Sequence, residues 1–323
     1  SLTQSVQFTH AICPIHSRRF AKPHANRHFA IEAIKKKFAD CEIGILKEGE
    51  ITGEEIDEKQ YIDQHYYAIA SKATILKPAA LNIPTDKFKA QFGEEWSDVL
   101  AKGRALNALD TKAKLGISAD ELDAKWGAAK KAGKLIKFGG GFYCGYLQDY
   151  DMYTFNAFFM TMRGNFTAPG TSIHYFVVVF DAAKLSWADF RGKVLGPTDP
   201  AEAPAESLRG SMYKDWKALG LSSTPNTGDN CVHASASPFE GFAERTNWLK
   251  GAYSFASDPF GKMMLDAGIP EATLKAWSVD PQVVIPGADG KKGSLFDQVE
   301  DMDVYECLAK LVEIYKAQPA EVS

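Results

Sequence analysis

Two kinds of periodicity alternate along the first 80 residues. Residues 6–12 and 42–51 are short apolar runs, and such runs predict β-strands. Residues 26–39 repeat apolar side chains at helical spacing, which predicts an amphipathic helix. Thr52 and Glu55 have the spacing of a capping box at the start of a second helix. The pattern therefore predicts one compact alternation of strand, helix, strand and helix.

The pattern changes over residues 81–150, where amphipathic helices dominate. One predicted helix carries four large apolar residues: Phe88, Phe92, Trp96 and Leu100. A second begins at Ser118, with Glu121 completing a capping box. A basic stretch at residues 130–134 then leads to three glycines at 139–141. We interpret the lysines as a solvated helix end and the glycines as a turn.

A compact pattern returns after residue 150. Four residues lie on one predicted helical face: Phe155, Phe158, Phe159 and Met162. A buried strand is expected around Val177, and a helix from Ser186. Residues 196–204 form a loop because their prolines exclude helix and strand alike. The last predicted element is a helix over residues 295–317.

Composition narrows the class of protein. The chain has 323 residues, 45% of them hydrophobic, and a formal net charge of -4, which gives no electrostatic argument for nucleic acid or an anionic membrane. The longest apolar run, residues 175–180, is too short to span a bilayer. The five cysteines are scattered, which favours a reducing, intracellular compartment over a disulfide framework or a zinc site. The N-terminus lacks the apolar segment of a secretory signal. It also lacks an initiator Met, so the sequence leaves open that a targeting peptide has been cleaved off.

One histidine stands in a setting that suggests chemistry. His233 follows two apolar residues and precedes small and hydroxylic ones, which predicts a strand-to-helix junction where helix N–H groups favour anions. A histidine beside such a site can act as a nucleophile toward phosphate. Upstream, Arg209 offers a bidentate donor for phosphate oxygens and Thr198 a hydroxyl. The remaining histidines are interpreted as structural or surface residues.

Three ordered motifs surround these residues: Gly-Pro-Thr-Asp-Pro at 196–200, Ser-Leu-Arg-Gly at 207–210, and Asn-Cys-Val-His-Ala-Ser-Ala-Ser at 230–237. With the His-Tyr pair at 65–66 and the aromatic run at 155–162, they resemble the nucleoside diphosphate kinase family. The resemblance implies an α+β, ferredoxin-like core, in which helices cover an antiparallel four-stranded sheet. Residues 1–80 and 151–250 form this core; residues 81–150 are a mostly helical insertion, and 251–323 a C-terminal helical extension.

The resemblance also implies roles. His233 accepts a phosphoryl group from a nucleoside triphosphate and passes it to a nucleoside diphosphate, with Tyr66 supporting it and Glu240 or Glu244 orienting it. The residues implied to bind the nucleotide are Asn230, Arg209, Thr198, Phe155 and Ser235, with Phe155 stacking on the base. Mg²⁺ enters as a cofactor on the nucleotide phosphates, with no protein side chain as ligand.

Several positions depart from the family pattern. In the family the first strand ends in a lysine before a proline, and taking residues 6–12 as this strand puts Cys13 in the lysine's place. Lys22, Arg18 and Arg19 remain alternatives. Near Gly192 the family has a second arginine. Ala236 stands where the family has an aspartate, after the first serine of the histidine motif.

The departures leave two main hypotheses. The chain is either a nucleoside diphosphate kinase, active or weakened, or an inactive module that serves as a structural or interaction subunit of a larger assembly. A nucleotide sensor without turnover lies between them. The expected partners are nucleoside di- and triphosphates, and proteins bound through the insertion or the extension; nucleic acid is not expected. The cytoplasm is the expected compartment, with a ciliary or organellar assembly as the alternative.

Overall fold

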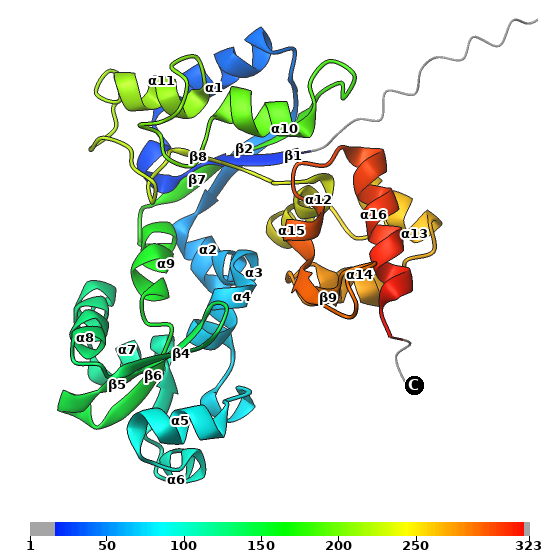
Figure 1. The fold of residues 1–323 in the computed structure, drawn as a ribbon. Helices are drawn as coiled ribbons and strands as arrows, with labels where there is room; N and C mark the ends of the chain where they lie inside the picture. Colours follow the sequence, from blue (N-terminus) through cyan, green and yellow to red (C-terminus); the bar gives the residue numbers. More distant parts are fainter. Residues whose placement is uncertain (1–16, 320–323) are drawn as a thin grey trace, which may run out of the picture. The chain divides into compact units, whose positions relative to one another are not determined.

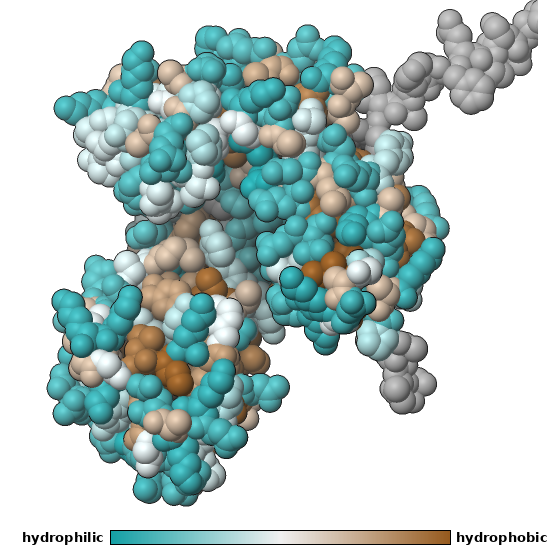
Figure 2. Space-filling model, viewed as in Figure 1, coloured by the Kyte–Doolittle hydropathy of each residue, from teal (hydrophilic) through white to brown (hydrophobic). Residues whose placement is uncertain are grey.

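The computed structural model describes residues 17–319. The chain divides into two compact units, unit 1 (Ser1–Ile51 and Ile173–Ser323) and unit 2 (Thr52–Ser172). The predicted first strand at residues 6–12 lies outside the described residues. Figure 2 shows mostly hydrophilic residues on the visible face of each unit, with a hydrophobic patch on unit 2. No helix within residues 17–319 combines the length and apolar character needed to cross a membrane.

Unit 1 contains the following strands and helices: β1 (Ser17–Ala21), α1 (His28–Asp40), β2 (Gly44–Thr52), β7 (Ser172–Val179), α10 (Trp187–Asp189), α11 (Leu208–Asp215), β8 (Val232–Ala234), α12 (Pro238–Trp248), α13 (Pro259–Asp266), α14 (Glu271–Trp277), β9 (Gln282–Val284), β10 (Lys292–Ser294), α15 (Leu295–Val299) and α16 (Val304–Ala317). Four strands form a sheet in the order β2-β7-β1-β8, and β1 pairs antiparallel with both β7 and β8. The predicted α+β class is confirmed.

The core of unit 1 explains why these elements form. The predicted strand around Val177 is β7, whose Phe176 and Val178 are fully buried. On α1, Ile34 and Phe38 face the sheet, and the Phe38 ring meets Phe176 edge-on at 5.5 Å. Helices α1 and α11 cover one face of the sheet (Figure 1).

The C-terminal extension packs into this same core. Residues of α13, α14 and α16 are buried with α12: Phe260, Met264, Leu274, Trp277, Leu311 and Ile314. Arg245 of α12 and Asp258, the N-cap of α13, form a buried ion pair at 2.6 Å. The helix predicted over residues 295–317 is broken into α15 and α16, with Asp301 between them at φ 61°. The extension thus supports the helix that follows β8.

Unit 2 contains the following strands and helices: α2 (Gly53–Glu58), α3 (Tyr61–His65), α4 (Tyr67–Ala70), α5 (Thr85–Phe92), α6 (Trp96–Ala101), β3 (Ala105–Asn107), α7 (Ala108–Leu115), α8 (Ala119–Lys131), β4 (Leu135–Gly139), β5 (Phe142–Leu147), β6 (Met152–Phe155) and α9 (Phe159–Thr167). The expected insertion was mostly helical, but the strands form a second sheet, in the order β3-β6-β5-β4. Its β3–β6 pairing is parallel and the others are antiparallel.

Caps and turns define several boundaries in unit 2. The capping box predicted at Ser118 and Glu121 is present in full, whereas of the one predicted at Thr52 only the bond from the Glu55 N–H to Thr52 Oγ1 is found. The helix predicted across residues 88–100 is two helices, because Gly93 adopts φ 76° between them. The predicted glycine turn lies between β4 and β5, where Gly141 has φ 61°.

Candidate functional site

β8 places His233 beside the first strand of the sheet. In the antiparallel pairing of β1 and β8, Phe20 is the backbone partner of His233. The chain then turns into α12, whose N-cap Ser237 accepts the Glu240 N–H through Oγ at 3.1 Å. The strand-to-helix junction predicted around His233 is therefore present.

A buried carboxylate orients the imidazole. His233 Nε2 lies 2.5 Å from Oε1 of Glu244, and Glu244 is only 3% exposed. Ser235 Oγ donates to the other carboxylate oxygen at 2.6 Å. When Nε2–H of a neutral imidazole donates to a carboxylate, the lone pair is on Nδ1. Of the two carboxylates left open by the sequence, Glu244 is the one bonded to His233, and Ser235 contacts Glu244.

Glu240 occupies a different position in the same turn. Its carboxylate accepts the backbone N–H of Ala236. Burial, together with the negative charge of Glu244, raises the pKa of Glu240 to about 8. This shift favours the protonated form of Glu240, next to a carboxylate that orients His233.

The backbone just before β8 is strained. Cys231 is fully buried and adopts φ 68°, and the Val232 N–H donates to the Asn230 carbonyl at 2.8 Å, as in a γ-turn. The Cys231 N–H donates to His24 Nε2 at 3.2 Å, which fixes that ring as an acceptor. Such strain is retained only where the surrounding structure enforces it, and it clusters at functional sites.

Asn230 joins this turn to the proline-rich loop. Its Nδ2 donates to the Thr198 carbonyl at 3.1 Å, whereas its Oδ1 is buried without a partner among the described residues. The Thr198 side chain is exposed. An unpaired buried acceptor is costly, so a donor that reached Asn230 Oδ1 would stabilise this turn.

Arg209 fixes the same loop against β8. Its guanidinium donates to the Gly196 carbonyl at 2.8 Å and to the Val232 carbonyl at 2.9 Å, and its Nε is buried without a partner among the described residues. Burial, and next the positive charge of Arg191, lowers the pKa of Arg209 to about 10. Three of the predicted residues, Arg209, Thr198 and Asn230, are therefore brought together near His233.

A lysine and a proline follow the first described strand of the sheet. The strand that pairs with β8 is β1, and it is followed by Lys22 and Pro23, so a lysine before a proline is present. Cys13 lies outside the described residues. The Lys22 N–H donates to the Cys231 carbonyl, and Nζ donates to the Gly228 carbonyl, both at 2.8 Å. Lys22 is one of the three alternatives that the sequence left open for this position.

Lys22 contributes a positive charge to a region that already holds Arg209. Burial, and next the charge of Arg209, lowers the pKa of Lys22 to about 8, although Asp229 and Cys231 oppose this shift. Two cations held together against burial and mutual repulsion form a site that an anion stabilises.

Gly192 and Ala236 are the other two positions at which the sequence departs from the family pattern that it resembles. Gly192 is exposed, and neighbouring Arg191 forms ion pairs with Glu300 at 2.8 Å and with Asp301 at 2.5 Å. Arg191 therefore binds the C-terminal segment. The backbone N–H of Ala236 donates to the Glu240 carboxylate.

Two predicted site residues belong to unit 2. Tyr66 follows α3, and its ring meets His65 edge-on at 4.6 Å; its support of His233 stays a prediction. Phe155 ends β6 and is fully buried, with ring contacts to Trp96 and Phe142. The predicted stacking of Phe155 on a base is wrong, because its ring is enclosed in the core of unit 2.

No protein-family model and no curated protein matches this sequence. Among solved structures, a nucleoside diphosphate kinase from Encephalitozoon cuniculi is similar at 13% identity and a TM-score of 0.36, covering 77% of this chain and 97% of that one. An NDP kinase from Pyrobaculum aerophilum is similar at 18% identity and a TM-score of 0.35, covering 73% and 95%. These values do not assign the chain to that family, so a function has to be argued from the site.

Proposed function

We propose that this protein transfers a phosphoryl group from a nucleoside triphosphate to a nucleoside diphosphate through a phosphohistidine at His233. The observation that carries the proposal is the pairing of His233 Nε2 with Glu244, in the same part of unit 1 as the half-buried cations Lys22 and Arg209. A carboxylate-oriented imidazole supplies a nucleophile, and unneutralised cations favour a phosphate. We further propose that unit 1 is ferredoxin-like, which its strand order supports.

In the first half-reaction, His233 Nδ1 attacks the terminal phosphorus of the triphosphate. The bond from that phosphorus to the bridging oxygen breaks, and the nucleoside diphosphate leaves with the electron pair. Glu244 stabilises the charge that develops on the ring through Nε2–H. In the second half, a terminal oxygen of another nucleoside diphosphate attacks the same phosphorus and regenerates the imidazole.

The remaining residues hold the nucleotide. Lys22 and the Thr198 hydroxyl bind phosphate oxygens, and Asn230 Oδ1 accepts a hydrogen bond from a sugar hydroxyl. Arg209 holds the loop and β8 together and adds positive charge. Mg²⁺, bound to the phosphates, offsets their charge, and no residue of this chain is proposed as its ligand.

The proposal is tested by incubating the full chain with ATP labelled in the γ-phosphate. We expect acid-labile, alkali-stable phosphate on the protein, and its release on addition of GDP. His233→Ala abolishes the label, whereas His28→Ala, a change at an exposed histidine of the same unit, retains it. No label on the wild-type protein, or equal label on the His233→Ala variant, would falsify the proposal.

A second candidate is a module that binds nucleotide without turnover. It is favoured by one observation, the engagement of Arg191 by Glu300 and Asp301 beside the glycine at the second family arginine. In that case, ADP raises the melting temperature of the chain, and the label is absent. A protein that neither binds ADP nor takes up label would leave only the structural role.

A further inference from the structure

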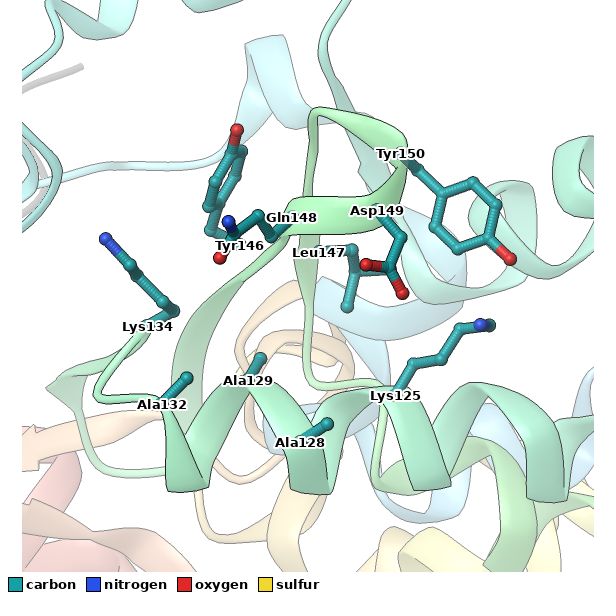
Figure 3. A pocket seen from close by; sticks show the side chains of 10 residues that line it. All are labelled: Lys125, Ala128, Ala129, Ala132, Lys134, Tyr146, Leu147, Gln148, Asp149 and Tyr150. Atoms are coloured by element: carbon teal, nitrogen blue, oxygen red, sulfur yellow. The ribbon is translucent and has the colours of Figure 1, made fainter.

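Unit 2 contains a small pocket that the proposed phosphoryl transfer does not use. It lies between α8 and the turn that follows β5, with a volume of about 160 Å³ (Figure 3). Ala128 of α8, Ala132 directly after that helix and Leu147 of β5 supply apolar surface, and the Tyr150 ring stands at one end. Binding sites for whole small molecules usually measure about 300–1,000 Å³, so this volume suits a single apolar side chain.

Two lysines line the pocket, and three more lie close to them in the sequence. We call the residues Lys125, Lys130, Lys131, Lys134 and Lys137 the lysine face. The last four are exposed, and Lys125 and Lys134 line the pocket at opposite ends. Among the described residues of unit 2, the ion pairs formed by lysines involve Lys59, Lys77 and Lys89 and no member of the lysine face. Two members lie over aromatic rings: Lys125 over Tyr150 at 4.8 Å and Lys137 over Tyr143 at 5.6 Å. The carboxylate that lines the pocket, Asp149, lies at the Lys125 end.

The charge distribution on α8 argues against nucleic acid as the partner. Helices α7 and α8 are joined by a short turn with Gly116 at φ 64°, and the hairpin of β4 and β5 follows. Helix-turn-helix proteins present the start of the second helix to DNA. Here that start carries Asp120, Glu121 and Asp123, which would repel phosphates.

We propose that the lysine face binds an acidic segment of a partner protein that inserts one large apolar side chain into the pocket. The apolar anchor contributes affinity through burial, and the flanking carboxylates face the lysines. This inference does not rest on phosphoryl transfer, because it uses none of the residues around His233.

The test is a selection of displayed random peptides on the immobilised full chain. Enriched peptides are expected to carry several Asp or Glu residues around one Leu, Ile, Met or Phe. Selected peptides are then titrated by fluorescence anisotropy. Replacing their apolar residue by Ala is expected to weaken binding about tenfold or more, the value of burying one such side chain.

Variants at exposed positions locate the binding surface. Lys134→Glu removes charge and Ala128→Leu fills the pocket, and each is expected to weaken binding about tenfold. Lys87→Glu makes the same charge change on α5 and serves as the matched control. It is expected to change the affinity for the peptide less than about twofold. The proposal is overturned if no acidic consensus is enriched or if Ala128→Leu leaves binding unchanged. It is also overturned if single-stranded RNA binds the lysine face and the pocket variant Ala128→Leu does not change that binding.

Discussion

Lys22 provides a prediction that joins the electrostatics of the site to binding. Burial, and next the charge of Arg209, lowers its pKa from a usual 10.5 to about 8, which disfavours the charged ammonium. A bound diphosphate reverses this by supplying negative charge. The gap between the two values corresponds to at most about 3 kcal/mol of coupling between protonation and ADP binding.

The sign of the pH dependence follows directly. Below pH 8, Lys22 is charged in the free protein, and ADP binding requires no proton uptake by it. Between about pH 8 and 10.5, the free protein holds a neutral Lys22, and binding takes up a proton. The affinity for ADP should therefore fall through this range, by up to about tenfold per pH unit.

Isothermal titration calorimetry at pH 9, in two buffers with different ionisation enthalpies, measures this proton. We expect uptake of nearly one proton per ADP for the wild type and almost none for Lys22→Met. At pH 7, the same variant should bind ADP about tenfold to a hundredfold more weakly, the value of a hydrogen bond to a charged group. Lys47→Met, a change at an exposed lysine on β2, is the control. Equal ADP affinity for Lys22→Met and the wild type would refute the reasoning.

Three further predictions concern single residues. Asp258→Asn leaves the buried Arg245 charge without its counter-ion, and urea unfolding followed by tryptophan fluorescence should show a loss of about 3–5 kcal/mol; a loss below about 1 kcal/mol would count against the buried pair. Glu244→Gln keeps the size of the side chain but removes the charge behind His233, so phosphohistidine formation should slow by about 10²–10³, and an unchanged rate would exclude the orienting role. Phe155→Ala should lower the free energy of unfolding of unit 2 by about 3–5 kcal/mol. Its ADP affinity, measured by isothermal titration, should change less than about twofold; a large loss of affinity in a folded variant would restore the stacking role.

Much of the site could be predicted because its motifs are local in sequence. The segment from Asn230 to Ser237 specifies a strand, a histidine and a helix cap within a few residues, and the structure has all three. The partner of the histidine was ambiguous because Glu240 and Glu244 lie on the same helix, one turn apart. Only the side-chain geometry shows that Glu244 meets the imidazole while Glu240 binds a backbone N–H.

The register of the first strand could not be decided from local pattern. Residues 6–12 form an apolar run before Pro14 and were predicted as a strand, whereas Ser17–Ala21, before Pro23, has two arginines in its centre and gives no such signal. What selects the second stretch is pairing with β7 and β8, which are distant in sequence. The apparent loss of the lysine was a consequence of this choice.

The second sheet was missed for a different reason. Its strands are short, and their aromatic residues also fit helical spacing. Phe155 illustrates the ambiguity, since it matches the helical face of α9 but ends β6, and Asn156 at φ 48° separates the two elements. A glycine turn between two β-prone runs was the available signal for β4 and β5.

The near-neutral net charge conceals how the positive charge at the site is held. Backbone carbonyls, rather than carboxylates in direct contact, fix the two cations: Gly228 accepts from Lys22, and Gly196 and Val232 accept from Arg209. A carbonyl orients a cation without cancelling its charge, so the site keeps its attraction for an anion. The strained turn at Cys231 serves the same end, because it brings the Lys22 backbone, the Asn230 amide and β8 to one place. A site whose only task was to stabilise the fold would gain more from pairing these cations with carboxylates.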